Sequence, residues 1–348
     1  MLPSLCGAQN EIYPGYIWHS LGNGIYVHAQ NNPLAGPVDG NSVVIVNDRG
    51  VMVVDTHINP AVARSVIKKI VSITDTPVTH VINTHWHDDH TNGNHAYREA
   101  FPGIKIVAHR ATLESLMEEW QAMEDQRREA YGSVDVGELR RAADSFEEND
   151  PNSAIGYRIY ADYVEALLPE LSTMELEYPD TVFEDSLVYK FGNRTIHLMW
   201  LGRGNTDGDI VVWLPEDRVL VTGDILVAPI PYAFDSPMLD WIRTLEQVAT
   251  LDAATIIPGH GSVQHDKRYL GLVQSLLEST VNAVRNAHDN GTAYADLANA
   301  VDLSEYESEF TDDDPERAWA WRAYYVSPGV KSAWSSLGYP LPVDDVSK

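Results

Sequence analysis

The sequence predicts an α/β protein in which two β-rich halves are sandwiched between outer helices. Short apolar runs rich in β-branched residues occur in the first third of the chain and again between residues 187 and 222. A segment with helical spacing follows each group, at residues 60–73 and 238–250. With 348 residues, 44% of them hydrophobic, the chain is long enough to bury a full core.

The first half of the chain is expected to alternate strands and helices. The expected strands share apolar, β-branched residues and cover residues 24–29, 42–46, 51–55, 78–83 and 104–108. The helix at residues 60–73 carries Val62, Val66, Ile70 and Ile73 at spacings of four and three, which is typical of an amphipathic helix. A second, shorter helix is expected at residues 94–101.

Residues 110–178 have a different composition from their surroundings. They are rich in Glu, Ala, Leu, Arg and Met and poor in β-branched residues, which predicts an insertion of two or three helices. Breaks are expected near Gly132 and around residues 149–152. The insertion is either a structural cover with a solvated acidic face or a lid. We favour a cover that also shapes a pocket.

The second half returns to strand character before it becomes helical. The expected strands cover residues 187–191, 195–200, 210–214, 219–222 and 254–257. Helices are expected at residues 238–250 and 265–290, and the tail at residues 293–337 has a helical pattern. We therefore expect a single domain with a core at about residues 20–265 and a helical C-terminal extension at residues 266–348.

The composition limits the classes of partner. A formal charge of −27 repels nucleic acids and anionic membrane surfaces, so we expect a small-molecule substrate and neither of those partners. The single cysteine, Cys6, excludes an intrachain disulfide. No apolar run reaches the length of a transmembrane helix, and no signal peptide is visible. The compartment stays open between the cytoplasm and, if a signal was trimmed, the periplasm or exterior. A homo-oligomer also stays open.

The most informative segment runs from Thr84 to His90 and holds three histidines and two aspartates within seven residues. It directly follows the expected strand at residues 78–83. Imidazole nitrogens and carboxylate oxygens are the ligands that divalent metals such as zinc prefer. Without a metal, so many polar groups at a strand end would be costly to remove from water. The segment therefore predicts a metal site, in preference to a solvated loop rich in histidine.

Three more side chains that can bind metal follow apolar runs elsewhere: Asp55, Asp224 and His260. Each is expected at the end of a strand. Sites in α/β proteins gather outside strand ends, so these side chains can converge despite their separation in sequence.

Together these residues make the chain resemble the metallo-β-lactamase fold superfamily over roughly residues 20–265. The resemblance rests on residues that occur in the family's order: Asp55, the run His85-x-His87-x-Asp89-His90, Asp224 and His260. It implies an αββα sandwich with a metal site at one edge, between the two sheets.

The resemblance also implies a role for each residue. The implied ligands divide between two metal positions: His85 and His87 with a third histidine at the first, and Asp89, His90 and His260 at the second. Asp224 would bridge both metals. Asp55 would hold the loop that carries the ligands.

One residue departs from the family's pattern. Asn205 stands where the third histidine of the first position is expected. Three outcomes are open. The side-chain oxygen of Asn205 binds the metal, or the first position binds metal weakly, or another histidine takes the place of the missing one. The candidates for that histidine are His57, His95, His109 and His197. Because an amide oxygen is a weaker zinc ligand than imidazole, we expect one or two zinc ions with the second position stronger.

The resemblance implies a zinc-activated water that opens or cleaves a small carbonyl substrate: a β-lactam, lactone, ester or thioester. A lactam-type ring or a lactone is favoured. Asp89 would orient the attacking group or shuttle its proton, and Asn205, if it is not a ligand, would donate to the developing oxyanion. Two alternatives remain: an iron-dependent sulfur dioxygenase on the same fold, and a metal-binding protein whose catalysis is lost.

Overall fold

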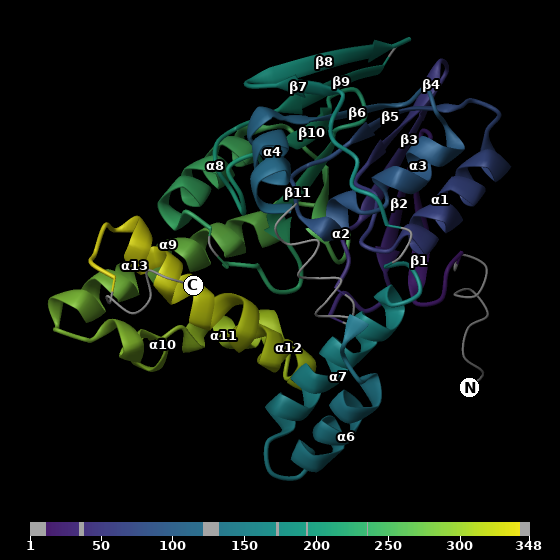
Figure 1. Cartoon of the computed structure of the whole chain (residues 1–348). Helices are drawn as coiled ribbons and strands as arrows, with labels where there is room; N and C mark the ends of the chain where they lie inside the picture. The colour runs from purple at the N-terminus through teal and green to yellow at the C-terminus, as the bar shows by residue number, and fades with distance from the viewer. Residues whose placement is uncertain are drawn as a thin grey trace, which may run out of the picture.

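The computed structural model describes residues 12–34, 38–120, 132–171, 174–192, 194–234 and 236–341 of the chain. Two β-sheets pack against each other, and helices cover the outer face of each (Figure 1). The layers are therefore helix, sheet, sheet and helix, as the sequence predicts.

The first sheet has seven strands whose order in space follows the chain. They are β1 (Tyr16–Gly22), β2 (Ile25–Gln30), β3 (Ser42–Asn47), β4 (Gly50–Val54), β5 (Val78–Ile82), β6 (Lys105–His109) and β7 (Thr181–Phe183). The first four strands pair antiparallel, and β4 to β7 pair parallel. The parallel strands β4, β5 and β6 are joined by helices α1 (Pro60–Ile73), α2 (Asp88–Thr91) and α3 (Asn94–Ala100).

The second sheet has five strands in the order β12-β11-β10-β9-β8. They are β8 (Ser186–Phe191), β9 (Arg194–Met199), β10 (Val211–Leu214), β11 (Val219–Val227) and β12 (Thr255–His260). β12 pairs parallel with β11, and helix α8 (Met238–Thr250) forms the connection between them. Within each sheet, the strands that carry or precede the candidate metal ligands are therefore parallel to each other: β4 and β5 in the first sheet, and β11 and β12 in the second.

The core explains why residues 43–46 of β3 are all apolar. Val43 and Ile45 face the second sheet and pack with Ile196 and Leu198 of β9. Val44 points to the opposite face, where α1 covers it. A strand that is covered on both faces has no solvent side, so its sequence does not alternate.

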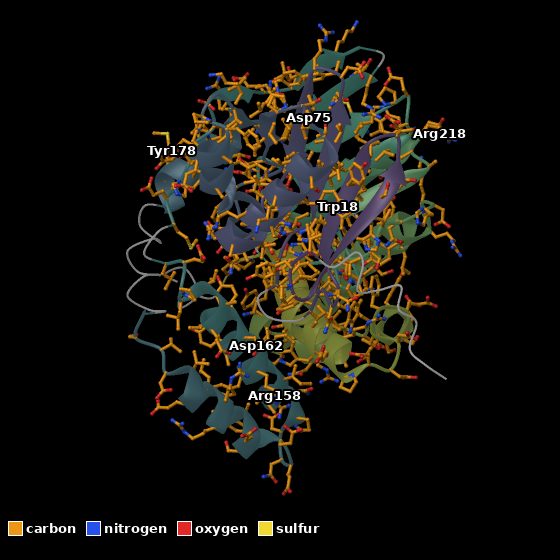
Figure 2. All side chains as sticks on the ribbon, turned by 90° about the vertical axis from the view of Figure 1, so that its right-hand side faces the viewer. Trp18, Asp75, Arg158, Asp162, Tyr178 and Arg218 are labelled. Carbon is orange, nitrogen blue, oxygen red and sulfur yellow. The ribbon has the colours of Figure 1, made fainter. Side chains whose placement is uncertain are left out.

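Helices of the insertion and of the C-terminal extension flank this core. The described insertion contains α4 (Arg110–Ser115), η1 (Leu116–Trp120), α6 (Val136–Phe146) and α7 (Pro151–Leu167). The extension contains α9 (Arg268–Asp289), η2 (Tyr294–Asp296), α10 (Leu297–Ala300), α11 (Ser304–Thr311), α12 (Pro315–Ala320), η3 (Trp321–Val326) and α13 (Ser327–Ser336). α6 and α7 project away from the sheets, as the positions of Arg158 and Asp162 show (Figure 2).

Caps and contacts place α7 beside the histidine segment. The Asp150 side chain accepts from the Ser153 amide, and Pro151 starts the helix, which gives the expected break between α6 and α7. The Asn59 amide donates to the carbonyl of Ala166 near the end of α7. The Tyr163 hydroxyl donates to Asp88 at 3.4 Å. The insertion thus covers one side of the histidine segment.

The expected strands and helices are present, with ends that shift by a few residues. Strands β1 and β7 were not predicted, since neither has a long apolar run. The expectation that Asp224 follows the end of its strand was wrong, because β11 continues to Val227. Cys6 lies outside the described residues. Among the described helices, none is both long and apolar enough to span a bilayer.

Candidate metal centre

The histidine segment forms a tight loop between β5 and α2. β5 ends at Ile82, and His85 lies three residues later. His87 is the N-cap of the four-residue helix α2, so Asp89 and His90 lie inside its single turn. His85 and His90 are fully buried, whereas Asp89 keeps 15% of its side chain exposed. The loop therefore presents candidate ligands both from the interior and at the surface.

Asp55 fixes the shape of this loop. It follows β4 with a left-handed backbone (φ 57°). Its two carboxylate oxygens accept from the Thr84 amide at 2.8 Å and the Thr84 hydroxyl at 2.7 Å. Its Oδ2 also lies 2.9 Å from Nδ1 of His90. Because Nδ1 is held there, Nε2 of His90 points toward the other candidate ligands, which is the usual task of a carboxylate behind a ligand histidine.

Asp89, His90 and His260 form one compact group of ligand atoms. Oδ2 of Asp89 lies 3.0 Å from Nε2 of His260 and 3.4 Å from Nε2 of His90. The two Nε2 atoms are 3.3 Å apart. One oxygen and two nitrogens that converge in this way can hold a divalent cation.

The carboxylate of Asp224 lies between this group and His85. Its Oδ1 lies 3.3 Å from Nε2 of His90 and 3.4 Å from Nε2 of His260. Its Oδ2 lies 3.7 Å from Nε2 of His85, and His85, His90 and Asp224 form a second metal-capable group. The same carboxylate therefore faces both positions.

The backbone around His260 is built for this close approach. A Cβ atom on Gly259 would lie 2.0 Å from Oδ1 of Asp224, so only glycine fits there. The side-chain amide of Asn41 donates to the carbonyls of Pro258 and Gly261, each at 2.9 Å. Gly40 packs directly against the ring of His90. The loop at residues 38–41 thus ties the His260 segment to the histidine loop.

The charges of the group are strongly coupled. Burial would raise the pKa of the Asp89 and Asp224 carboxyls, but the neighbouring His90 and His260 hold both well below the usual range. Burial lowers the pKa of His90 and His260, yet the facing carboxylates outweigh it and raise that of His260 to about 9. These carboxylates therefore demand positive charge, from protons or from a cation.

One buried atom supports a fit to metal. Oδ1 of Asp224 has no hydrogen-bond partner among the described residues. A buried carboxylate oxygen without a partner is costly unless it faces a cation. The donor set is made of imidazole and carboxylate, which suits zinc.

His87 and Asn205 stand apart from the two groups. Nδ1 of His87 lies 2.9 Å from Nε2 of His85, and His87 belongs to neither group of three ligands. The amide of Asn205 donates to Oδ2 of Asp224 at 3.2 Å, and its oxygen accepts from Ser236 at 3.1 Å.

The other candidate histidines are engaged elsewhere. His57 contacts Asp39 and His28, while His109 bonds to the carbonyl of Glu184. Among the described residues, neither metal-capable group includes His57, His95, His109 or His197.

Tyr232, whose place in the loop soon after Asp224 is visible in the sequence, completes the surroundings together with residues that the sequence did not reveal. The ring of Tyr232 lies 5.1 Å from that of His260 and 5.2 Å from that of Tyr324 in η3. Burial raises the pKa of the Tyr232 phenol well above its usual value, so Tyr232 stays a neutral hydroxyl beside the group. Asn41 had a weak signal in its Gly-Asn turn, but Ser236 had none, because its partners are distant in sequence.

The chain is similar to known proteins. A family model described as the metallo-beta-lactamase superfamily matches residues 35–260. A linear primary-alkylsulfatase from Pseudomonas is 24% identical over 261 residues, which cover 69% of this chain and 44% of that protein. The metallo-beta-lactamase type 2 of Bacteroides fragilis is 23% identical over 257 residues, which cover 70% of this chain and 79% of that protein. The chain thus matches less than half of the alkylsulfatase.

Solved structures show the same fold. A metallo-beta-lactamase from Pontibacter korlensis superposes with a TM-score of 0.52 at 17% identity, covering 76% of this chain and 99% of that one. The DIM-1 metallo-beta-lactamase gives a TM-score of 0.52 at 16% identity, covering 76% and 98%. The αββα fold that the sequence resemblance implies is confirmed.

The role of Asp55 leads to a test. Replacing Asp55 by Asn leaves a single acceptor oxygen for three donors, so His90 loses its fixed orientation. We expect zinc affinity, measured by competition with a chromophoric chelator, to fall by about 10- to 100-fold. The matched control is Asp75→Asn at an exposed position. Equal affinities for the two variants would contradict the orienting role.

Asp209 gives a test of pH dependence. Burial raises its pKa to about 7, and the Asp224 carboxylate adds to the rise, although hydrogen bonds from Thr206 oppose it. The folded protein therefore binds this proton more tightly than the unfolded chain, in which the pKa is about 3.9. The resulting stabilisation is complete below about pH 4 and is lost as the pH rises to about 7, at up to about 1.4 kcal/mol per pH unit.

The Asp209→Asn variant mimics the protonated carboxyl and removes this titration. For metal-free protein, urea unfolding between pH 4 and pH 7 should show a steeper loss of unfolding free energy in the wild type than in the variant. Contributions from other groups cancel in the difference between the two proteins. Parallel stability profiles would show that Asp209 does not hold the proton.

Proposed function

The chain belongs to the metallo-β-lactamase superfamily of metallo-hydrolases, and we propose that it is a zinc-dependent enzyme that opens or cleaves a small carbonyl substrate. The observation that carries the proposal is the pair of donor groups that share His90, with one oxygen of Asp224 close to His85 and the other close to His90 and His260. Within the carbonyl class, a β-lactam, a lactone, an ester and a thioester all suit this chemistry. A lactam-type ring or a lactone is the leading choice.

The donors divide unequally between the two positions. Asp89, His90 and His260 would hold one ion with Oδ1 of Asp224. His85 and His87 would hold a second with Oδ2 of Asp224. The set with Asp89 has four protein donors, and the set with His85 and His87 has three. We therefore expect the set with Asp89 to bind zinc more tightly.

Zinc bound here would lower the pKa of a coordinated water from 15.7 to about 7 and polarise a carbonyl oxygen. The chain's own residues position and protect that chemistry. His90 and His260 are fully buried, so they fix the centre from the interior. Asp89 is the partly exposed donor, so its carboxylate is placed to orient a substrate-side group and to pass a proton. The Tyr232 ring covers His260 on the side of the C-terminal extension and excludes water there.

A second candidate substrate is a sulfate ester. It is favoured by the similarity to the alkylsulfatase, although the match spans less than half of that protein. A sulfate ester, like a carbonyl compound, offers an oxygen that a cation can polarise and a leaving group that a proton donor can assist.

A chelation and replacement experiment tests the proposal. Protein stripped by a chelator should be inactive and should regain activity with zinc on one of five probes: a chromogenic cephalosporin, a lactone, an aryl ester, a thioester or a primary alkyl sulfate. Asp89→Ala should lower kcat/KM on that probe by about a hundredfold or more, because a ligand is worth at least as much as its outer partners. Asp75→Ala is the control at an exposed position.

Two outcomes would contradict the proposal. If zinc-loaded Asp89→Ala turned over substrate at the wild-type rate, Asp89 would not be part of the active site. Activity that follows iron content and consumes oxygen would identify an oxidoreductase on the same scaffold.

A further inference from the structure

The amide of Asn205 lies between two polar partners. Nδ2 donates to Oδ2 of Asp224 at 3.2 Å, and Oδ1 accepts from the Ser236 hydroxyl at 3.1 Å. Asn205 is 8% exposed and Ser236 is 1% exposed, so both hydrogen bonds are shielded from water. The orientation of this amide therefore matters for the buried carboxylate.

Chemistry fixes that orientation. An ionised carboxylate only accepts hydrogen bonds, so the side of the amide that faces Asp224 must be its NH₂ group. The opposite orientation would place the amide oxygen against the carboxylate oxygen and leave a buried repulsion. The amide oxygen, which is the only atom of Asn205 that could ligate zinc, is therefore turned toward Ser236.

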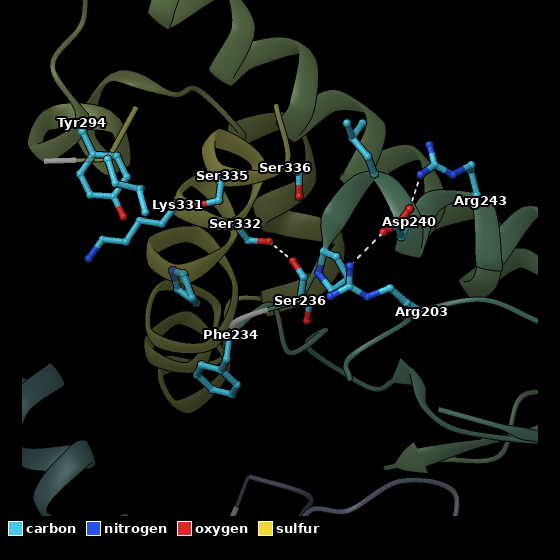
Figure 3. Close-up of a pocket in the computed structure, with 14 residues that line it drawn as sticks. Arg203, Phe234, Ser236, Asp240, Arg243, Tyr294, Lys331, Ser332, Ser335 and Ser336 are labelled. Carbon is cyan, nitrogen blue, oxygen red and sulfur yellow. Dashed lines mark hydrogen bonds and ion pairs between the residues drawn. The ribbon is translucent and has the colours of Figure 1, made fainter. Parts of the chain in front are cut away.

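Ser236 connects Asn205 to the C-terminal extension. The hydroxyl of Ser332 in α13 donates to the backbone carbonyl of Ser236 (Figure 3). Both serines line a groove of about 750 Å³ between α8 and α13. None of the metal donors lines this groove. Hydrogen bonds thus connect α13 to the backbone of Ser236, the side chain of Ser236 to Asn205, and Asn205 to the carboxylate that both metal positions share.

We propose that Asn205 is a positioning residue that does not ligate metal: through Ser236 and Ser332 it lets the C-terminal extension hold Asp224 in place. This inference rests on the metal-dependent function proposed above. Its consequence is an asymmetric centre, because the position served by His85 and His87 keeps only three protein donors. Three protein ligands with one exchangeable place characterise catalytic zinc, whereas four close a site.

Ser332→Ala tests the chain of hydrogen bonds at the end farthest from the metal. It removes one hydroxyl and leaves Asn205 and every metal donor unchanged. Losing one buried hydrogen bond is worth about 1 kcal/mol, so we expect zinc to bind about fivefold more weakly in a chelator competition. The matched control is Ser335→Ala, on the same helix and lining the same groove but exposed. It should bind zinc like the wild type.

A second variant separates positioning from ligation. Asn205→Ala should weaken zinc binding at least as much as Ser332→Ala, but the visible absorption of the cobalt-loaded protein should keep the wild-type coordination number. A changed coordination number would make Asn205 a ligand and overturn the inference. Wild-type zinc affinity in both Ser332→Ala and Asn205→Ala would also overturn it.

The controls distinguish this failure from failure of the proposed function. Circular dichroism of each variant shows whether it folds. If Ser332→Ala does not fold, the zinc affinity of Asn205→Ala decides whether Asn205 positions Asp224. A wild-type protein that binds no zinc at all would refute the metal-dependent function itself. Wild-type protein that binds zinc, with variants that bind equally well, refutes only the role of Asn205.

Discussion

The buried carboxylate of Asp224 is the constraint on which the rest of the centre depends. It is 2% exposed, and three imidazole Nε2 atoms lie within 3.7 Å of its oxygens. A carboxylate removed from water in this way is stable only beside positive charge. The same requirement applies to Asp89, so the two acids together demand positive charge at one place, which bound zinc would supply in the proposed function.

The surrounding structure serves to keep these donors at a fixed separation. Asp55 orients His90, and Asn41 holds the loop that carries His260. Gly259 allows that loop to approach Asp224 to a distance that any side chain would block. The contacts come from both sheets and from the C-terminal extension. The extension is therefore part of the centre's support, and Tyr324 and Ser332 contribute to it from helices that the matched family region does not include.

Much of this could be predicted from the sequence, because strand patterns and the histidine run are local signals. The segment from Thr84 to His90 indicated metal chemistry by composition alone, and apolar runs placed Asp55 and His260 at strand ends. The strand that carries Asp224 was predicted to end too early. Gly223 adopts a positive φ of 50° and shifts the register inside β11, but the strand continues beyond it. Nothing local in the sequence signals that irregularity.

The environment of Asn205 could not be predicted for a different reason. Its partner Ser236 is 31 positions away, and Ser332 is another 96 positions beyond that. Only the folded chain brings them together, so the sequence left three outcomes open for Asn205. The hydrogen-bond chemistry of a carboxylate then decides which end of the amide faces Asp224.

Anomalous diffraction from crystals of the zinc-loaded protein tests the central claim most directly. The result expected is a strong zinc peak among Asp89, His90, His260 and Asp224, with any second peak beside His85 and His87 and with the Asn205 oxygen outside its ligands. Zinc bound elsewhere, or a map in which these four side chains share no cation, would contradict it.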